Sequence, residues 1–114
     1  MSNERKELGK IQAVKFGIGG YNDACLGIFF TLGGENWGVC AEKSALDSNL
    51  VPVYEHAKWT EVDRSRQYDE IMRYVSDLLK VAKVDDVSRL VGKPIEATFD
   101  GMMLKSWRIL TEVL

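Results

Sequence analysis

The chain has 114 residues, of which 46% are hydrophobic and 28% are charged, and its net charge is -2 at pH 7. These values are typical of one globular domain, and no apolar run reaches the roughly 18 residues that a membrane helix needs. The acidic balance argues against a protein that coats duplex nucleic acid by charge alone. One histidine and two cysteines without a paired spacing predict no metal site.

The N-terminal residues 1–8 are mostly polar or charged, and we expect them to be flexible. They lack the apolar segment and the small-residue cleavage site of an export signal. We therefore expect a cytoplasmic protein, in which Cys25 and Cys40 remain reduced. Both cysteines lie in apolar runs, which predicts two buried thiols in the core.

Three strands are predicted in the first part of the chain. Residues 10–16 alternate as a strand does. Its two faces are predicted to carry Gln12, Val14 and Phe16 on one side and Ile11, Ala13 and Lys15 on the other. A glycine-rich loop follows, and the apolar residues 24–32 predict a strand that is covered on both faces. Residues 37–41, after the Gly33-Gly34 turn signal, predict its partner.

Residues 42–58 show no dominant period and contain Pro52, so they are predicted to form a long loop. A short strand is possible within it near residues 51–54. Loops of this length are uncommon in compact domains and often carry function.

A long helix is the best-determined element of the sequence. Thr60 followed by Asp63 resembles a capping box, with Asp in place of the preferred Glu or Gln. The apolar residues that follow recur at helical spacing, which predicts one apolar stripe. These residues are Tyr68, Ile71, Met72, Val75, Leu78, Leu79 and Ala82.

The C-terminal part predicts a short helix and a hairpin. Asp85 or Asp86 is expected to cap a helix that continues to Leu90. Two strand-like runs, starting near Gly92 and Leu104, flank an Asp100-Gly101 pair, which is a strong signal of a tight hairpin turn.

The predicted order of elements is β-β-β-α-β-β, with one long amphipathic helix. This order predicts a single α+β domain over residues 1–114, built as a small antiparallel sheet or as an OB-like barrel. OB-folds use their barrel face for single strands and small ligands.

Several runs of the sequence, taken together, resemble those of a known group of proteins. The runs are Phe16-Gly17-x-Gly19-Gly20-Tyr21-x-Asp23-Ala24, Gly27-Ile28-x-Phe30-x-Leu32-Gly33-Gly34-x-x-Trp37-Gly38, Lys58-Trp59-Thr60-Glu61, Ala82-Lys83-Val84-x-Asp86-Val87, Gly92-Lys93-Pro94-x-Glu96-x-Thr98-Phe99 and the C-terminal Ser106 to Leu114. They resemble small proteins encoded by bacteriophages and prophages, over most of the chain. Members often carry a Gly-Asp-Phe-like run where this chain has Cys40-Ala41-Glu42. The resemblance implies a phage origin and a bacterial host's cytoplasm, and it implies no particular reaction.

The first candidate ligand site is the glycine-rich loop with Gly19, Gly20 and Tyr21. Glycine permits close approach, so backbone N–H groups there could hold a phosphate. The loop lacks the lysine and serine of a nucleotide-binding P-loop and precedes a strand. A structural hairpin loop is the alternative.

The second candidate site is the start of the long helix, where the macrodipole favours an anion. Trp59 could stack on a base while cations meet phosphate groups. Alternatively, Trp59 is a hydrophobic staple and the basic residues are solvated. The residues are His56, Lys58, Trp59, Arg64 and Arg66.

Catalysis is not predicted, because no pair of acidic, histidine, serine or cysteine residues has a spacing that forces it into one site. Trp37 and Trp107 lie in strand patterns and are expected to pack in or across the sheet. No cofactor is predicted.

The leading functional hypothesis is a non-catalytic phage-type protein that binds. It would sequester a nucleotide-like anionic ligand, such as a host immune second messenger, or block a host defence protein. A homo-oligomer is expected, since a shared pocket lets small chains enclose a ligand. The alternatives are an OB-like protein that binds single-stranded nucleic acid and a protein-protein interaction module.

Overall fold

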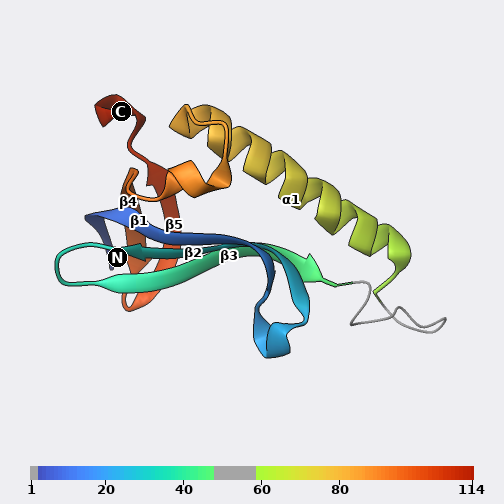
Figure 1. The fold of residues 1–114 in the computed structure, drawn as a ribbon. Coiled ribbons are helices and arrows are strands. Elements are labelled where there is room, and N and C mark those ends of the chain that lie inside the picture. Colours follow the sequence, from blue (N-terminus) through green and yellow to red (C-terminus); the bar gives the residue numbers. More distant parts are fainter. Residues whose placement is uncertain (1–2, 48–58) are drawn as a thin grey trace.

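The computed structural model describes residues 3–47 and 59–114. It shows a five-stranded antiparallel sheet that curls into a half-barrel, with one long helix packed on it (Figure 1). The α+β class and the order β-β-β-α-β-β are therefore confirmed. No helix in the described part is both long enough and apolar enough to cross a membrane.

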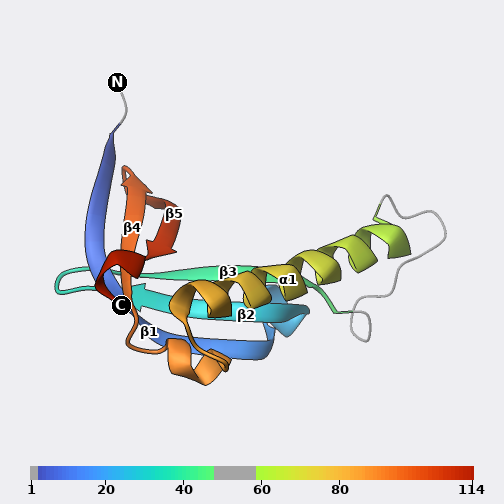
Figure 2. The ribbon, with the colours of Figure 1, turned by 90° about the horizontal axis from the view of Figure 1, so that it is seen from above.

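The strands are β1 (Glu4–Gly19), β2 (Cys25–Gly33), β3 (Gly38–Leu46), β4 (Pro94–Asp100) and β5 (Met103–Ile109). Their order in the sheet is β3-β2-β1-β4-β5, so β3 and β5 are the two outer strands. Closing a barrel would require these two to pair, and in the described part of the chain they do not. The long helix α1 (Glu61–Ala82) lies over the concave face of the sheet, as Figure 2 shows from above.

Strand β1 begins at Glu4, six residues before the predicted start. Residues 4–10 pair with β4, so the sequence-based expectation of a flexible 1–8 segment is wrong for residues 4–8. The charged side chains of this segment contact residues of the neighbouring strand β4. The Arg5 guanidinium lies 4.8 Å from the centre of the Phe99 ring, and Lys6 pairs with Glu96 at 3.8 Å. From the sequence alone, a strand with this many charged residues cannot be told from a solvated terminal segment.

A bulge at Gln12 makes the predicted faces wrong for Ile11 and Gln12 and leaves those of residues 13–16 as predicted. Ile11 pairs with Leu32 and Ala13 with Thr31, so Gln12 is an extra residue in the strand. Ile11 consequently lies in the core on the same face as Val14, whereas strict alternation places the two on opposite faces.

The core fills the concave face between the sheet and α1. Phe30 of β2 contacts both the sheet and the helix. Its ring lies 4.9 Å from the Trp107 ring of β5 and 6.4 Å from the Tyr74 ring of α1. Burial raises the pKa of Tyr74. The fully buried large residues are Ile11, Ile28, Leu32, Leu90 and Ile95.

The opposite face of β2 is open in the part of the chain that the structure describes. Ile28 and Phe30 are buried beneath α1, whereas Phe29 and Thr31 on the other face remain partly exposed. The prediction that both faces are covered is therefore wrong. The run of apolar residues at 24–32 arises because one face of β2 is covered by α1 and the open face also carries apolar side chains.

Strand β3 continues to Leu46, so the predicted loop at 42–58 starts too early. Five further residues of that segment pair with β2, from Glu42 opposite Phe29 to Leu46 opposite Cys25. The short strand predicted near residues 51–54 lies outside the described residues.

The C-terminal elements follow the prediction closely. Asp86 caps a 3-10 helix, η2 (Val87–Leu90), by accepting a bond from the Ser88 N–H at 2.8 Å. The hairpin turn is one residue later than predicted, because Asp100 pairs with Met103 and leaves Gly101 and Met102 as the turn. Gly101 has a φ of 62°, a value that favours glycine.

The predicted capping box at the start of α1 is confirmed. The Asp63 N–H donates to the Thr60 hydroxyl oxygen at 3.2 Å, and the Thr60 N–H donates to the Asp63 carboxylate at 2.9 Å. The hydrogen bonds that the Thr60 N–H and the Thr60 hydroxyl donate to the Asp63 carboxylate lower the pKa of Asp63 below its usual value. The folded protein therefore binds fewer protons at this carboxyl group than the unfolded chain does.

We expect Thr60→Ala to lower the free energy of unfolding by about 1 kcal/mol at neutral pH, because it removes the cap. The wild type should lose stability as the pH falls below the ordinary Asp value near 3.8, and Thr60→Ala should lose less of it over that range. Urea unfolding at several pH values measures both effects. Thr60→Ser retains the hydroxyl and should behave like the wild type. Equal loss in both variants would contradict a role for the cap.

Candidate functional site

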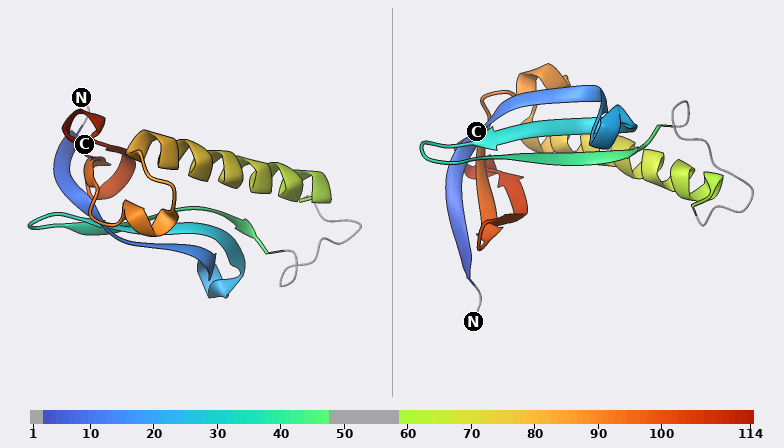
Figure 3. Two further views of the ribbon diagram at one scale, coloured as in Figure 1. Left: turned by 45° about the horizontal axis from the view of Figure 1, so that its top comes forward. Right: turned by 90° about the horizontal axis from the view of Figure 1, so that it is seen from below.

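The structure places the two predicted ligand sites in different parts of the molecule. Gly19 ends β1, Gly20 has a φ of 73°, and Tyr21 is 85% exposed in the short 3-10 helix η1 (Tyr21–Asp23). Figures 1 and 3 show this turn bending away from the sheet face that α1 covers. The start of α1 lies on that covered side, so the described part of the chain does not join the two sites.

At the helix start, Trp59 and Arg64 contact each other. The Arg64 guanidinium lies 4.5 Å from the centre of the Trp59 ring, and its Nη1 lies 2.6 Å from the Glu61 carboxylate. Arg64 is only 4% exposed, so little of its side chain is presented to a ligand at the surface. Arg66 is exposed and lies 3.7 Å from Asp63. The predicted His56 and Lys58 lie outside the described residues.

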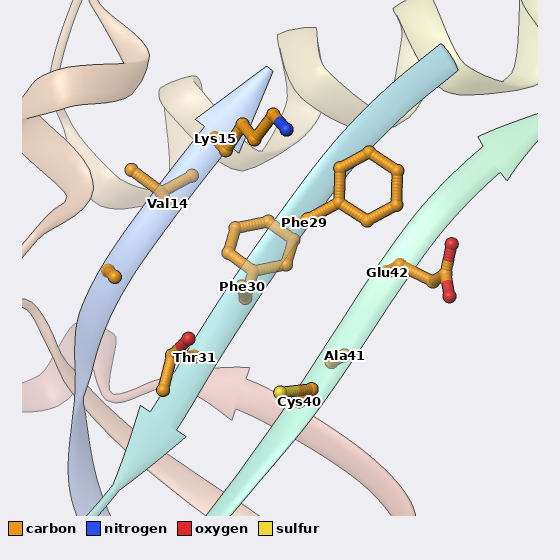
Figure 4. Close-up of a pocket in the computed structure, with 9 residues that line it drawn as sticks. Val14, Lys15, Phe29, Phe30, Thr31, Cys40, Ala41 and Glu42 are labelled. Carbon is orange, nitrogen blue, oxygen red and sulfur yellow. The ribbon is translucent and has the colours of Figure 1, made fainter. Parts of the chain in front are cut away.

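A hollow on the open face of the sheet brings together a different set of side chains (Figure 4). Strand register places Lys15 of β1 beside Phe29 of β2, and Phe29 beside Glu42 of β3. The next row consists of small side chains that form the floor: Ala13, Thr31 and Cys40. The hollow has a volume of about 360 Å³.

The predicted glycine turn borders this hollow. A methyl group built on Gly19 would lie 3.1 Å from the Phe29 ring. One built on Gly20 would lie 3.1 Å from the Cys25 side chain and 3.6 Å from the Glu42 carboxylate. Glycine at these two positions thus lets the turn approach the open face closely.

The hollow offers three kinds of binding group in one row. Phe29 presents an aromatic ring, Lys15 a cation on one side and Glu42 a carboxylate on the other. The Ser44 hydroxyl donates to the Glu42 carboxylate at 2.6 Å and holds it in place. An aromatic ring between a cation and an acceptor suits a planar ligand that has both an anionic group and hydrogen-bond donors.

The sequence-based reasoning missed Lys15, Phe29 and Glu42 as a group. The period-two pattern already placed Phe29 opposite in face to Phe30, and the Gly33-Gly34 turn indicated the β2–β3 pairing. The missing information was the extension of β3 beyond Ala41, which brings in Glu42. Cys40 was expected in the core and is exposed on this face; both described cysteines are free thiols.

Comparison with models of protein families, with curated proteins and with solved structures finds no match.

Proposed function

We propose that this protein binds, without transforming it, a nucleotide-like anionic ligand in the hollow on the open face of the sheet. The observation that carries the proposal is the row of Lys15, Phe29 and Glu42, which three neighbouring strands hold side by side. Each member matches one part of a nucleotide.

The ligand base would stack on the Phe29 ring, since every base has an aromatic face. Glu42 would accept a hydrogen bond from an exocyclic amino group, as carboxylates do with amino-bearing bases. Lys15 would contact the phosphate from the other side. The volume of about 360 Å³ lies at the lower end of the usual range for small-ligand sites.

The resemblance to small phage proteins supports a biological setting for this binding. In that setting the ligand would be a host immune second messenger, which the phage protein removes by sequestering it. Blocking a host defence protein directly is the related possibility.

Single-stranded nucleic acid is a second candidate ligand, favoured by the position of the hollow. It lies on β1–β3 beside the β1–β2 turn, and OB-folds bind oligonucleotides on the corresponding strands and loops. The acidic net charge of -2 weighs against it. Binding of a single strand would weaken steeply with added salt, whereas binding of one nucleotide would depend on salt weakly.

The test is a thermal-stability screen with mononucleotides, cyclic dinucleotides and short single-stranded oligonucleotides. A ligand at a hundred times its Kd should stabilise the folded state by about 2.7 kcal/mol, because only the folded state binds it. Lys15→Glu and Phe29→Ala should abolish this gain and leave the protein folded, as circular dichroism would show.

Trp59→Ala and Arg66→Ala are the control variants, because they alter the predicted site at the start of α1 and leave the hollow unchanged. They should leave the ligand-induced gain unchanged. If they abolish the gain and the open-face variants do not, the site is at the helix start. If no nucleotide raises the stability, the proposed function is wrong.

A further inference from the structure

Strand β1 has one stretch of backbone edge that no described strand covers. Its first half pairs with β4 up to Lys10, and its second half pairs with β2 from Lys10 to Gly19. On the side away from β2, Ile11 still bonds the segment after η2, with its N–H 3.0 Å from the Lys93 carbonyl oxygen. Beyond Ile11, no described strand pairs with this side of β1, and the 3-10 helix η2 lies close to β1 on the face that α1 covers (Figure 2).

This edge differs in chemistry from the two other edges of the sheet. Free strand edges invite further pairing, and proteins commonly protect them with charged residues or bulges. The β3 edge carries Glu42 and Lys43, and the β5 edge carries Lys105 and Arg108 next to a bulge. The β1 edge at residues 13–19 carries Lys15 as its one charged residue.

The side chains along this edge are apolar on the face that α1 covers. Phe16 is 46% exposed and Ile18 is 37% exposed, and Met72 of α1, which lines a cavity with Phe16, is 62% exposed. A cavity of about 290 Å³ lies between the edge and the helix, lined by Phe16, Leu26, Tyr68, Ile71 and Met72. An exposed apolar groove beside a free edge is the geometry in which a further strand is added.

We propose that a second copy of this chain occupies the edge, with the two β1 strands antiparallel and related by a two-fold axis at Phe16. Opposed residues of antiparallel strands share a face, which limits the possible registers. An axis at Lys15 would oppose two lysines, which is unfavourable. An axis at Phe16 places Val14 opposite the partner's Ile18 and Lys15 opposite the partner's Gly17.

Self-pairing satisfies both features of the edge at once. The apolar side chains of Val14, Phe16 and Ile18 would be covered by their own counterparts, and the backbone groups of both edges would bond each other. A two-fold contact also closes, because each copy has one such edge and uses it. The inference stands apart from the proposed ligand, although both hollows would then lie on the same face of the joined sheet.

The test is the mass of the protein in solution, measured by sedimentation. We expect the wild type to be a dimer, and Phe16→Glu and Phe16→Lys each to be monomers, because two like charges would meet at the axis. An equal mixture of the two variants should form dimers again, since residue 16 opposes itself and the mixed pair joins Glu to Lys. Circular dichroism and thermal unfolding establish that each variant is folded.

Met103→Glu and Met103→Lys are the matched controls, because Met103 is 76% exposed on the β5 edge. Both should remain dimers. A wild type that sediments as a monomer at its highest usable concentration would overturn the proposal and leave the groove to an extended peptide of another protein. Dimers that persist in both Phe16 variants would place the interface elsewhere. Monomeric variants whose mixture stays monomeric would exclude the axis at Phe16.

Discussion

Phe30→Ala is expected to lower the free energy of unfolding by about 3 to 5 kcal/mol, the usual cost of truncating a buried phenylalanine. Phe30 is buried and its ring meets Trp107 edge-on at 4.9 Å and Tyr74 at 6.4 Å. The substitution therefore opens a cavity where β2, β5 and α1 meet. Because small domains are stable by only about 5 to 15 kcal/mol, urea unfolding should show a much earlier transition.

Phe29→Ala is the matched control for this prediction. The two residues are neighbours in β2, but Phe29 points to the open face and remains partly exposed. Its truncation should cost much less than that of Phe30. Equal losses would contradict the assignment of covered and open faces. A double-mutant cycle of Phe30→Ala with Trp107→Leu should give a coupling of about 1 kcal/mol, the size found for aromatic pairs.

Gly27→Ala is expected to destabilise the fold by about 1 to 3 kcal/mol or more, through overpacking between β2 and β3. A methyl group at this position would lie 2.3 Å from the Lys43 carbonyl oxygen and 2.5 Å from the Ser44 Cα. Both contacts are with backbone atoms, so the two strands would have to separate. The midpoint of urea unfolding measures this loss.

Gly17→Ala tests whether the effect is specific to that contact. Gly17 pairs with Gly27 in the sheet, yet among the described residues a methyl group on it would meet only the Lys15 Cε, at 3.7 Å. Alanine there should be neutral or stabilise by up to about 1 kcal/mol, because glycine weakens a strand interior. If both alanine variants lost the same stability, strand propensity would explain the effect and the close approach of β3 would not.

Local patterns in the sequence predicted the elements whose cause is itself local. The capping box of Thr60 and Asp63, the apolar stripe of α1 and the Asp86 cap each depend on residues within a few positions. The hairpin turn around Gly101 was placed to within one residue for the same reason. The α+β class followed from the order of these elements.

The candidate site could be predicted only in part. Gly19 and Gly20 were identified from their glycine signal, and the structure places them beside the hollow. Lys15, Phe29 and Glu42 gave no such signal, because they lie far apart in the sequence, on three different strands. Only the pairing of those strands brings them side by side. Trp59 and Arg64 do lie together, as neighbours at a helix start should.

The sequence by itself thus determined the order of the elements, the capping box at the start of α1 and the last hairpin turn to within one residue. The tertiary structure decided which face of each strand is covered, since the bulge at Gln12 moves Ile11 into the core and α1 covers Phe30 but not Phe29. It also decided that β1 divides its pairing between β4 and β2, which leaves the edge at residues 13–19 without a partner strand among the described residues. The physical reason is that helix caps and turns are set by neighbouring residues, whereas strand register and burial depend on segments far apart in the chain.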